Sequence, residues 1–295
     1  MKLDTQAKLA VAYSGLAWGL FWLPLRILND AGISGLWALL LFYGVPAALA
    51  LPWLIARWRP AVQGGLWLNL LGLATALPLV LYSVAVLQTE VVRAMLLFYM
   101  SPVWSTVLAR LVLGERITPV RWLTLLLAFL GLGAILGFDK GLPSLQNWGD
   151  LAALLAGFGW SVSTVLLRLK QGFSPADLFH HNLAWSAVLA MPLVWLFAPL
   201  PAPTLAAMLS QLWWLAPMLV AVVMTGVYAS MWGAPKLSPA LVGILLMTEI
   251  VAGTVSAALW AGEPFGWREA AGIGLIALAG SLESVRDYLH GRRSA

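Results

Sequence analysis

The sequence predicts an all-α integral membrane protein with ten transmembrane helices, arranged as two inverted-topology five-helix repeats around a central cavity. Of its 295 residues, 61% are hydrophobic and only 10% are charged, whereas soluble domains contain roughly 25% charged residues. The mean hydropathy is +0.88, and the apolar residues form runs of about 20, the length that crosses a bilayer as a helix. Short segments of alternating polarity, typical of a membrane barrel, are absent from the sequence.

Ten apolar runs are separated by turns that combine charge with glycine or proline, such as 114–116 and 236–239. Because lipid offers the backbone no hydrogen-bond partners, each run is expected to be a helix. The first run is long enough to span and is followed by no small-residue cleavage site, so we expect it to be retained rather than cleaved. The predicted spans are 8–27, 34–56, 66–88, 91–113, 120–138, 149–169, 177–198, 210–233, 238–261 and 267–285.

The basic residues predict the orientation of these spans. With the N-terminus inside, 13 of the 17 lysines and arginines fall on the inner side, and only Arg26, Arg93, Lys140 and Arg268 fall outside. Inner loops of membrane proteins are enriched in basic residues, so both termini are predicted to be cytoplasmic. The pI of about 9.7 then follows from topology, and no nucleic-acid partner is expected.

The two halves of the chain, 1–145 and 146–295, resemble each other. Three matches in order relate them: Gly-Leu-Ala-Trp at 15–18 with Arg26 recurs 142 positions later at 157–160 with Arg168, Tyr82 matches Tyr228 after 146 positions, and Gly114-Glu115 matches Gly262-Glu263 after 148. Five spans per half place the second half upside down in the membrane. Inverted repeats of this kind are typical of secondary transporters.

Short motifs in both halves resemble the EamA repeat of the drug/metabolite transporter superfamily. The first half carries them as Trp18-Gly19, Ser101-Pro102, Gly114-Glu115-Arg116 and Gly131/Gly133. The second half is a degraded copy, with Ile250 where Pro102 maps and Ser281 where Gly133 maps. Within that superfamily the chain is most similar to the aromatic amino acid exporters. The resemblance implies a ten-helix exporter in the bacterial cytoplasmic (inner) membrane, with a cavity lined from spans one, three, four, six and eight.

Several residues near the middle of the spans are candidates for that cavity. Tyrosine and tryptophan at mid-depth carry a polar atom that needs a partner, so they are expected to face the bundle interior, although ordinary packing is an open alternative. Pro78 and Pro102 each free a helix carbonyl, which a substrate ammonium, water or a neighbouring helix could satisfy. The predicted substrate-binding residues are Trp18, Tyr82, Tyr99, Ser101, Trp104, Trp160, Ser163, Tyr228 and Glu249, and Trp185 also lies at mid-depth.

Glu249 is the one acid near the middle of a span. A charge at the bilayer centre costs roughly 2.5–3.5 kcal/mol on insertion scales, so such a residue usually faces water or a partner. Glu249 could carry a proton, hold a substrate ammonium, or only hydrogen-bond Thr248. At the outer mouth of the fourth span, Arg93 and Glu90 are spaced to form an ion pair.

Signatures of enzymes, metals and cofactors are missing from the sequence. It has no phosphate-binding loop, no cysteine and only three histidines. His180 and His181 are interpreted as interfacial residues, with a gate or proton relay as the alternative. Glycine pairs at 15/19 and 133/137 are interpreted as surfaces where helices approach closely, because they follow the small-xxx-small pattern. No metal site and no cofactor are therefore expected.

The function expected from these observations is export of aromatic and other bulky neutral amino acids by alternating access, with the lipid bilayer as surroundings. An apolar, aromatic pocket with few polar groups suits a ring with one zwitterionic end. The alternatives are export of other metabolites or drugs, such as nucleosides or threonine-like amino acids, and a membrane interaction protein without cargo. The sequence leaves the oligomeric state open, and a monomer is compatible with it.

The topology predicts that reporter tags fused to the N-terminus and to the C-terminus both lie in the cytoplasm, since ten crossings return the chain to its starting side. Fusions to alkaline phosphatase and green fluorescent protein measure this directly. A periplasmic location of either tag would contradict the ten-span count.

Overall fold

The computed structural model describes residues 3–57, 65–89, 91–137, 145–198, 201–262 and 265–291. These ranges are largely helical and contain no strand, as the apolar runs predicted. The helices are α1 (Leu3–Trp18), α2 (Trp22–Asp30), α3 (Leu36–Ala56), α5 (Gly65–Gln88), α6 (Val91–Phe98), α7 (Ser101–Val112), α8 (Pro119–Leu136), α9 (Trp148–Leu169), α10 (Pro175–Phe197), α11 (Leu205–Leu209), α12 (Leu212–Met218), the π-helical η2 (Leu219–Met224), α13 (Thr225–Gly233), the 3-10 turn η3 (Ala234–Lys236), α14 (Pro239–Leu246), α15 (Thr248–Ala261) and α16 (Trp267–Gly291).

These helices combine into ten long segments that correspond to the ten predicted spans. Four segments are composite, namely α1–α2, α6–α7, α12–η2–α13 and α14–α15. Within the described residues, eight segments are long and apolar enough to cross a membrane by length and composition. The other two are α10, which begins with polar residues such as Asp177 and His180, and α16, which has Arg268 and Glu269 in its first turn.

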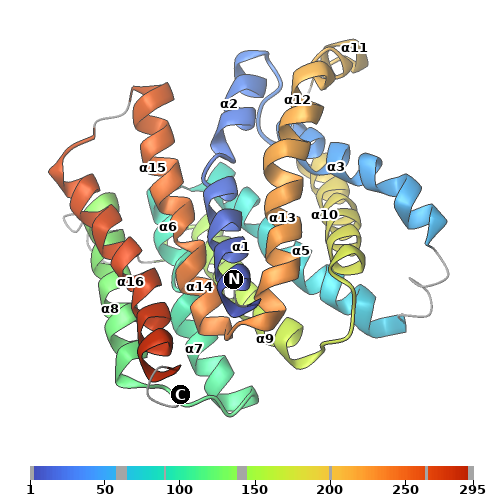
Figure 1. Ribbon diagram of the computed structural model, residues 1–295. Helices are drawn as coiled ribbons and strands as arrows, with labels where there is room; N and C mark the ends of the chain where they lie inside the picture. The colour runs from blue at the N-terminus through green and yellow to red at the C-terminus, as the bar shows by residue number, and fades with distance from the viewer. Residues whose placement is uncertain are drawn as a thin grey trace.

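The two halves interleave rather than forming separate bodies. The fifth and tenth segments, α8 and α16, pair at one side of the bundle, and α3 pairs with α10 at the other. Between them, α1 packs on α13, α14 and α15, while α9 packs on α5, α6 and α7 (Figure 1). Each half therefore completes its core with helices of the other half.

The first and fourth segments break beside prolines. Pro24 cannot donate to the carbonyl of Leu20, which accepts from Leu23 N–H at 3.1 Å in a tight turn between α1 and α2. Pro102 is the second residue of α7 and follows the break at Met100 by two residues, as its predicted kink requires. Pro78, in contrast, lies inside the continuous helix α5.

The ninth segment breaks at Met247 although it has no proline there. Ile250 occupies the position equivalent to Pro102, and its N–H bonds the carbonyl of Met247 at 3.0 Å. The Thr248 hydroxyl donates to the carbonyls of Ala12 (2.7 Å) and Leu245 (2.8 Å). In the second half the break is thus accompanied by contacts with α1, whereas the equivalent break in the first half is accompanied by a proline.

Each broken helix presents a carbonyl to a glycine of the opposite half. A Cβ added at Gly157 would lie 2.4 Å from the carbonyl oxygen of Phe98, and one added at Gly15 would lie 2.8 Å from that of Leu246. Gly157 follows Gly15 by 142 positions and Leu246 follows Phe98 by 148. The same contact therefore occurs twice, once in each half of the fold.

A second repeated contact lies close by. A Cβ at Gly159 would lie 3.2 Å from Cγ of Pro78, and a Cβ at Gly226 would lie 2.8 Å from Cβ of Ala17. These pairs again follow offsets of 142 and 148. The predicted match of Tyr82 with Tyr228, at 146 positions, is therefore wrong, because the offset of 148 in these helices aligns Tyr82 with Ser230.

The acidic turns of the two halves share one backbone conformation. Gly114 and Gly262 follow the fourth and ninth segments with φ of 70° and 69°, a left-handed conformation that glycine adopts without a steric penalty. Their offset is also 148. Glu263, the predicted partner of Glu115, lies outside the described residues.

The two predicted glycine surfaces differ in the structure. Gly15 lies close to α14 and α15, and Gly19 lies close to α15, as predicted. Gly137 instead ends α8 as its C-cap, so a helix face formed by Gly133 and Gly137 is wrong. The close contact of α8 is made by Gly131, where an added Cβ would lie 2.7 Å from the carbonyl oxygen of Gly272.

Arg93 pairs with an acid that the sequence analysis did not single out. Its guanidinium bonds the fully buried carboxylate of Asp150, in the first turn of α9. Asp150 also accepts from the Thr89 hydroxyl at 2.7 Å and from the Gln146 N–H at 2.8 Å. This network ties α9 to the α5–α6 connection. Glu90, the predicted partner of Arg93, lies outside the described residues.

We predict that Gly157→Ala lowers the free energy of unfolding by about 1–3 kcal/mol, because its Cβ would overlap a backbone carbonyl that cannot move alone. The matched control is Gly44→Ala, which also lies inside a helix but has no atom within 4 Å of an added Cβ. That control should leave stability unchanged or raise it by up to about 1 kcal/mol. Thermal unfolding in detergent measures both. Equal midpoints for the two variants would contradict the close contact.

Candidate functional site

A cavity of about 320 Å³ lies between the first, second, third, fourth and ninth segments. It extends from Glu249, at the break of the ninth segment, to the α2–α3 end of the bundle. A narrower cavity of about 30 Å³ continues inward from it and shares Trp18, Phe21, Tyr82 and Glu249. The remaining lining residues are Gly19, Trp22, Leu25, Arg26, Asn29, Gly35, Ala38, Leu79, Ser83, Val86, Leu87, Met95, Phe98, Trp160, Leu246 and Gly253.

Aromatic rings form much of the wall. Trp18 lies 6.0 Å from Phe21 between ring centroids, and Tyr82 lies 4.5 Å from Phe98. Phe98 also meets Tyr99 edge-on at 5.3 Å. Trp18 and Trp160 each follow their contact glycine by three residues, which is nearly one helical turn. The glycine contacts thus place one tryptophan from each half at the cavity.

The polar groups of the cavity are few. Among the described lining residues, Glu249 is the one acid, and Arg26, at the α2–α3 end, is the one base. Among the described lining residues, the buried indole N–H of Trp160 has no hydrogen-bond partner. The Tyr99 hydroxyl lies beside Glu249. Orphaned polar atoms next to a cavity are expected where a ligand or water completes the bonding.

The structure brings together five of the nine predicted site residues. Trp18, Tyr82, Trp160 and Glu249 line the cavity, and Tyr99 lies beside Glu249 without lining it. These five residues come from helices of both halves of the chain, so both halves contribute to the site.

The other four predicted residues lie outside the lining. The Ser163 hydroxyl is fully buried and donates to the carbonyl of Trp160 at 2.7 Å. Ser101 is buried, and its carbonyl accepts from Ser161. The ring of Trp104 packs edge-on against Phe158 at 5.9 Å. Tyr228 is 44% exposed and packs against Phe179. Trp185, also at mid-depth, lies against Gly72.

Several lining residues were missed by the sequence analysis. Phe21, Trp22 and Leu25 surround the turn between α1 and α2, and the signal for that turn was Pro24. Phe98 and Met95 face the cavity because α6 ends at the break before Pro102. A break changes the direction of the helix axis, so the residues on its two sides do not follow one helical period and a regular helix did not predict these lining residues.

The histidines lie at the α9–α10 end of the bundle. The ring of His180 stacks on Trp53 with centroids 3.7 Å apart, and the Arg57 guanidinium lies 5.0 Å from the centroid of the Trp53 ring. Arg57 also approaches Asp177 at 3.5 Å. Among the described residues no three His, Asp or Glu side chains are grouped as metal ligands would be.

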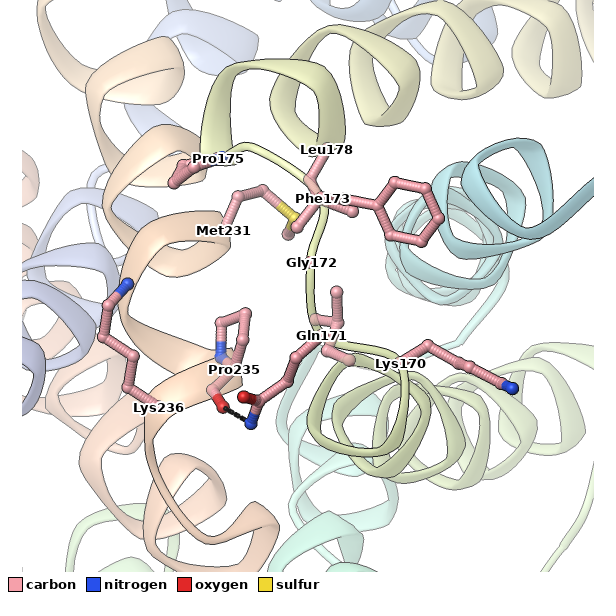
Figure 2. Close-up of a pocket in the computed structure, with 10 residues that line it drawn as sticks. Lys170, Gln171, Gly172, Phe173, Pro175, Leu178, Met231, Pro235 and Lys236 are labelled. Carbon is pink, nitrogen blue, oxygen red and sulfur yellow. Dashed lines mark hydrogen bonds between the residues drawn. The ribbon is translucent and has the colours of Figure 1, made fainter. Parts of the chain in front are cut away.

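A second cavity, of about 180 Å³, lies at the α9–α10 end, between the loop that follows α9 and the turn η3. Figure 2 shows that its two lysines, Lys170 and Lys236, point in opposite directions. Their amines lie 4.2 Å and 4.1 Å from the ring centroids of Trp67 and Trp232. The two lysines therefore do not converge on a common anion.

Comparison with known proteins identifies the family. The model of the EamA-like transporter family matches residues 6–137 and 147–282. One solved crystal structure superposes with a TM-score of 0.74 at 19% sequence identity, over 95% of this chain and 97% of that chain. That likeness shows the fold alone. No curated protein matches the chain. The two family matches cover most of the sequence, one in each half, and the chain therefore belongs to the EamA-like transporter family of multi-pass membrane transporters.

Proposed function

We propose that this transporter is a secondary exporter of aromatic and other bulky neutral amino acids, working by alternating access across the bacterial cytoplasmic membrane. The observation that carries the proposal is the cavity lining, in which Trp18, Phe21, Tyr82 and Phe98 surround one carboxylate, Glu249. A ring of the substrate would pack on these side chains, since aromatic pairs add about 0.5–1.5 kcal/mol beyond area burial.

The polar end of such a substrate has partners in the same place. Glu249 would accept the ammonium group. The Trp160 indole N–H, which lacks a partner among the described residues, would orient the carboxylate. Sugar nucleotides and phosphorylated metabolites fit poorly, because the deep part of the lining contains no described lysine or arginine.

The predicted positive-inside orientation places the α9–α10 end in the cytoplasm. On this proposal the 320 Å³ cavity faces the outside, and the structure corresponds to an outward-facing state. We further propose 1–145 and 146–295 as the two repeat units, with both termini cytoplasmic. Rocking of the interleaved halves about Glu249 would expose the cavity to the other side.

The single deep carboxylate also favours a second class of cargo, cationic aromatic amines such as hydrophobic drugs. The site has an acid but no base close to it, so a ligand without a carboxylate group is expected to bind nearly as well as a ligand with one. Competition by phenethylamine against phenylalanine distinguishes the two classes. Stronger inhibition by the amine would favour the drug alternative.

In proteoliposomes loaded with labelled phenylalanine or tryptophan, we expect efflux from vesicles that contain the protein. Trp18→Ala should reduce this efflux about tenfold, because burying one aromatic ring contributes about 1.5–3 kcal/mol. Tyr228→Ala is the matched control, since it removes an aromatic side chain outside the cavity and should leave efflux unchanged.

Equal efflux by Trp18→Ala and the wild type would remove Trp18 from the binding site. Flux of a nucleoside or drug without any amino acid flux would support the alternative cargo. Absence of all flux would favour a membrane interaction protein instead of an amino acid exporter.

Glu249→Gln keeps the shape of the side chain but removes the carboxyl group that can gain and lose a proton. If Glu249 couples transport to protons, this variant should lose the part of the flux that responds to an imposed pH gradient. Asp30→Asn, an exposed acid outside the cavity, should keep it. A wild-type flux that is insensitive to the pH gradient would refute the coupling role.

A further inference from the structure

The repeated contacts give a residue-by-residue map between the halves. Residues of α1 correspond to residues of α9 that lie 142 positions later, and the match of Arg26 with Arg168 at the same offset extends this correspondence into α2. Residues from Pro78 to Gly114 correspond to residues 148 positions later, because the offset is the same at both ends of that stretch, Pro78 with Gly226 and Gly114 with Gly262. Any contact at one end of the bundle therefore predicts an equivalent contact at the opposite end.

One polar contact joins α9 to the turn η3 at the α9–α10 end. The carbonyl of Pro235 accepts from the guanidinium of Arg168 at 3.1 Å and from the amide of Gln171 at 3.2 Å. Figure 2 shows the second bond across the small cavity. We name these three groups the inner clamp. It holds the end of α9 against the connection between the eighth and ninth segments.

The map places matching residue types at the other end of the bundle. Arg168 corresponds to Arg26, Gln171 to Asn29 and the Pro235 carbonyl to that of Leu87. An arginine and a carboxamide three residues apart are thus present in both halves. Leu87 lies in the last turn of α5, where helix carbonyls have no intrahelical donor.

The equivalent bonds are open in this structure. Arg26, Asn29 and Leu87 all line the 320 Å³ cavity. Among the described residues neither Arg26 nor Asn29 makes a side-chain hydrogen bond, and the Arg26 guanidinium lies 5.9 Å from the centroid of Trp22. The larger cavity, of about 320 Å³, therefore lies at the end where the equivalent clamp is not formed, whereas at the other end the clamp bridges the smaller cavity of about 180 Å³.

We propose that Arg26 and Asn29 bind the Leu87 carbonyl in the opposite, inward-facing state, while the inner clamp of Arg168, Gln171 and Pro235 opens. This inference rests on the proposed alternating access. One clamp forms when the other opens, because the inverted symmetry that relates the two halves also relates the residues of the two clamps. Each clamp stabilises closure of its own end, so Arg26 and Arg168 act as opposing gate residues.

The test measures the width of the outer mouth without any substrate. The sequence contains no cysteine. Cysteines introduced by Ala31→Cys and Gln88→Cys, both at exposed positions, are therefore the only sites that a thiol-reactive spin label modifies. The labelled full chain is studied in lipid nanodiscs. Electron–electron double resonance reports the distance between them. A short distance marks a closed outer mouth and a long distance an open one.

Arg168→Met removes the stronger donor of the inner clamp and should raise the ratio of short to long distances about tenfold, the effect of one hydrogen bond to a charged group. Adding Arg26→Met to that variant should reverse the shift, because the outer clamp is then lost as well. Gln171→Ala should shift the ratio in the same direction by less, and this exposed position keeps the test available if Arg168→Met does not fold.

Arg110→Met is the matched control, since Arg110 is an exposed arginine on α7 outside both clamps. The proposal is overturned if Arg168→Met and Gln171→Ala give the distances of Arg110→Met. It is also overturned if the double variant retains the short distance of Arg168→Met. Label distances need no transported substrate, so a failed amino acid flux assay and a failed gate test are separate results.

Discussion

Close approach of helix backbones across the two halves is the constraint on which the structure depends. At Gly15 and Gly157 a helix lies so near a carbonyl of a broken neighbour that a Cβ would overlap it. Helices approach this closely only where small residues line the contact. The same contacts fix the positions of Trp18 and Trp160, one helical turn further on. The cavity wall and the packing of the bundle thus follow from one pair of contacts.

The repeat is symmetric in backbone but not in chemistry. The offset of 148 aligns Glu249 with Ser101 and Met247 with Tyr99, so only the second half contributes an acid to the cavity. Ser101 is buried away from the lining, whereas Glu249 lies at its centre. An asymmetric site suits a ligand with two different ends, since one binding pose is then favoured over its reverse. The ends of the bundle, in contrast, keep matching arginines in both halves.

Much of the fold could be predicted from the sequence, because the bilayer imposes a length and a polarity on every helix. Ten spans, a break beside Pro102 and the paired glycine turns at Gly114 and Gly262 follow from local signals. Chemical identity also identified Trp18, Tyr82, Trp160 and Glu249 as candidates. Mid-depth position alone did not separate them from Trp104 and Tyr228, because depth in the membrane does not show which face of a helix meets the cavity.

The sequence by itself determined the membrane class, the number of long helices, the inverted repeat and the residue types available for binding. The tertiary structure decided which residues meet. It paired Arg93 with Asp150, broke the ninth segment at Met247 without a proline, and brought Arg26 and Leu87 to the same cavity. These results depend on contacts between segments more than 50 positions apart, and hydrophobic runs in lipid specify that a helix forms but not which neighbour it packs against.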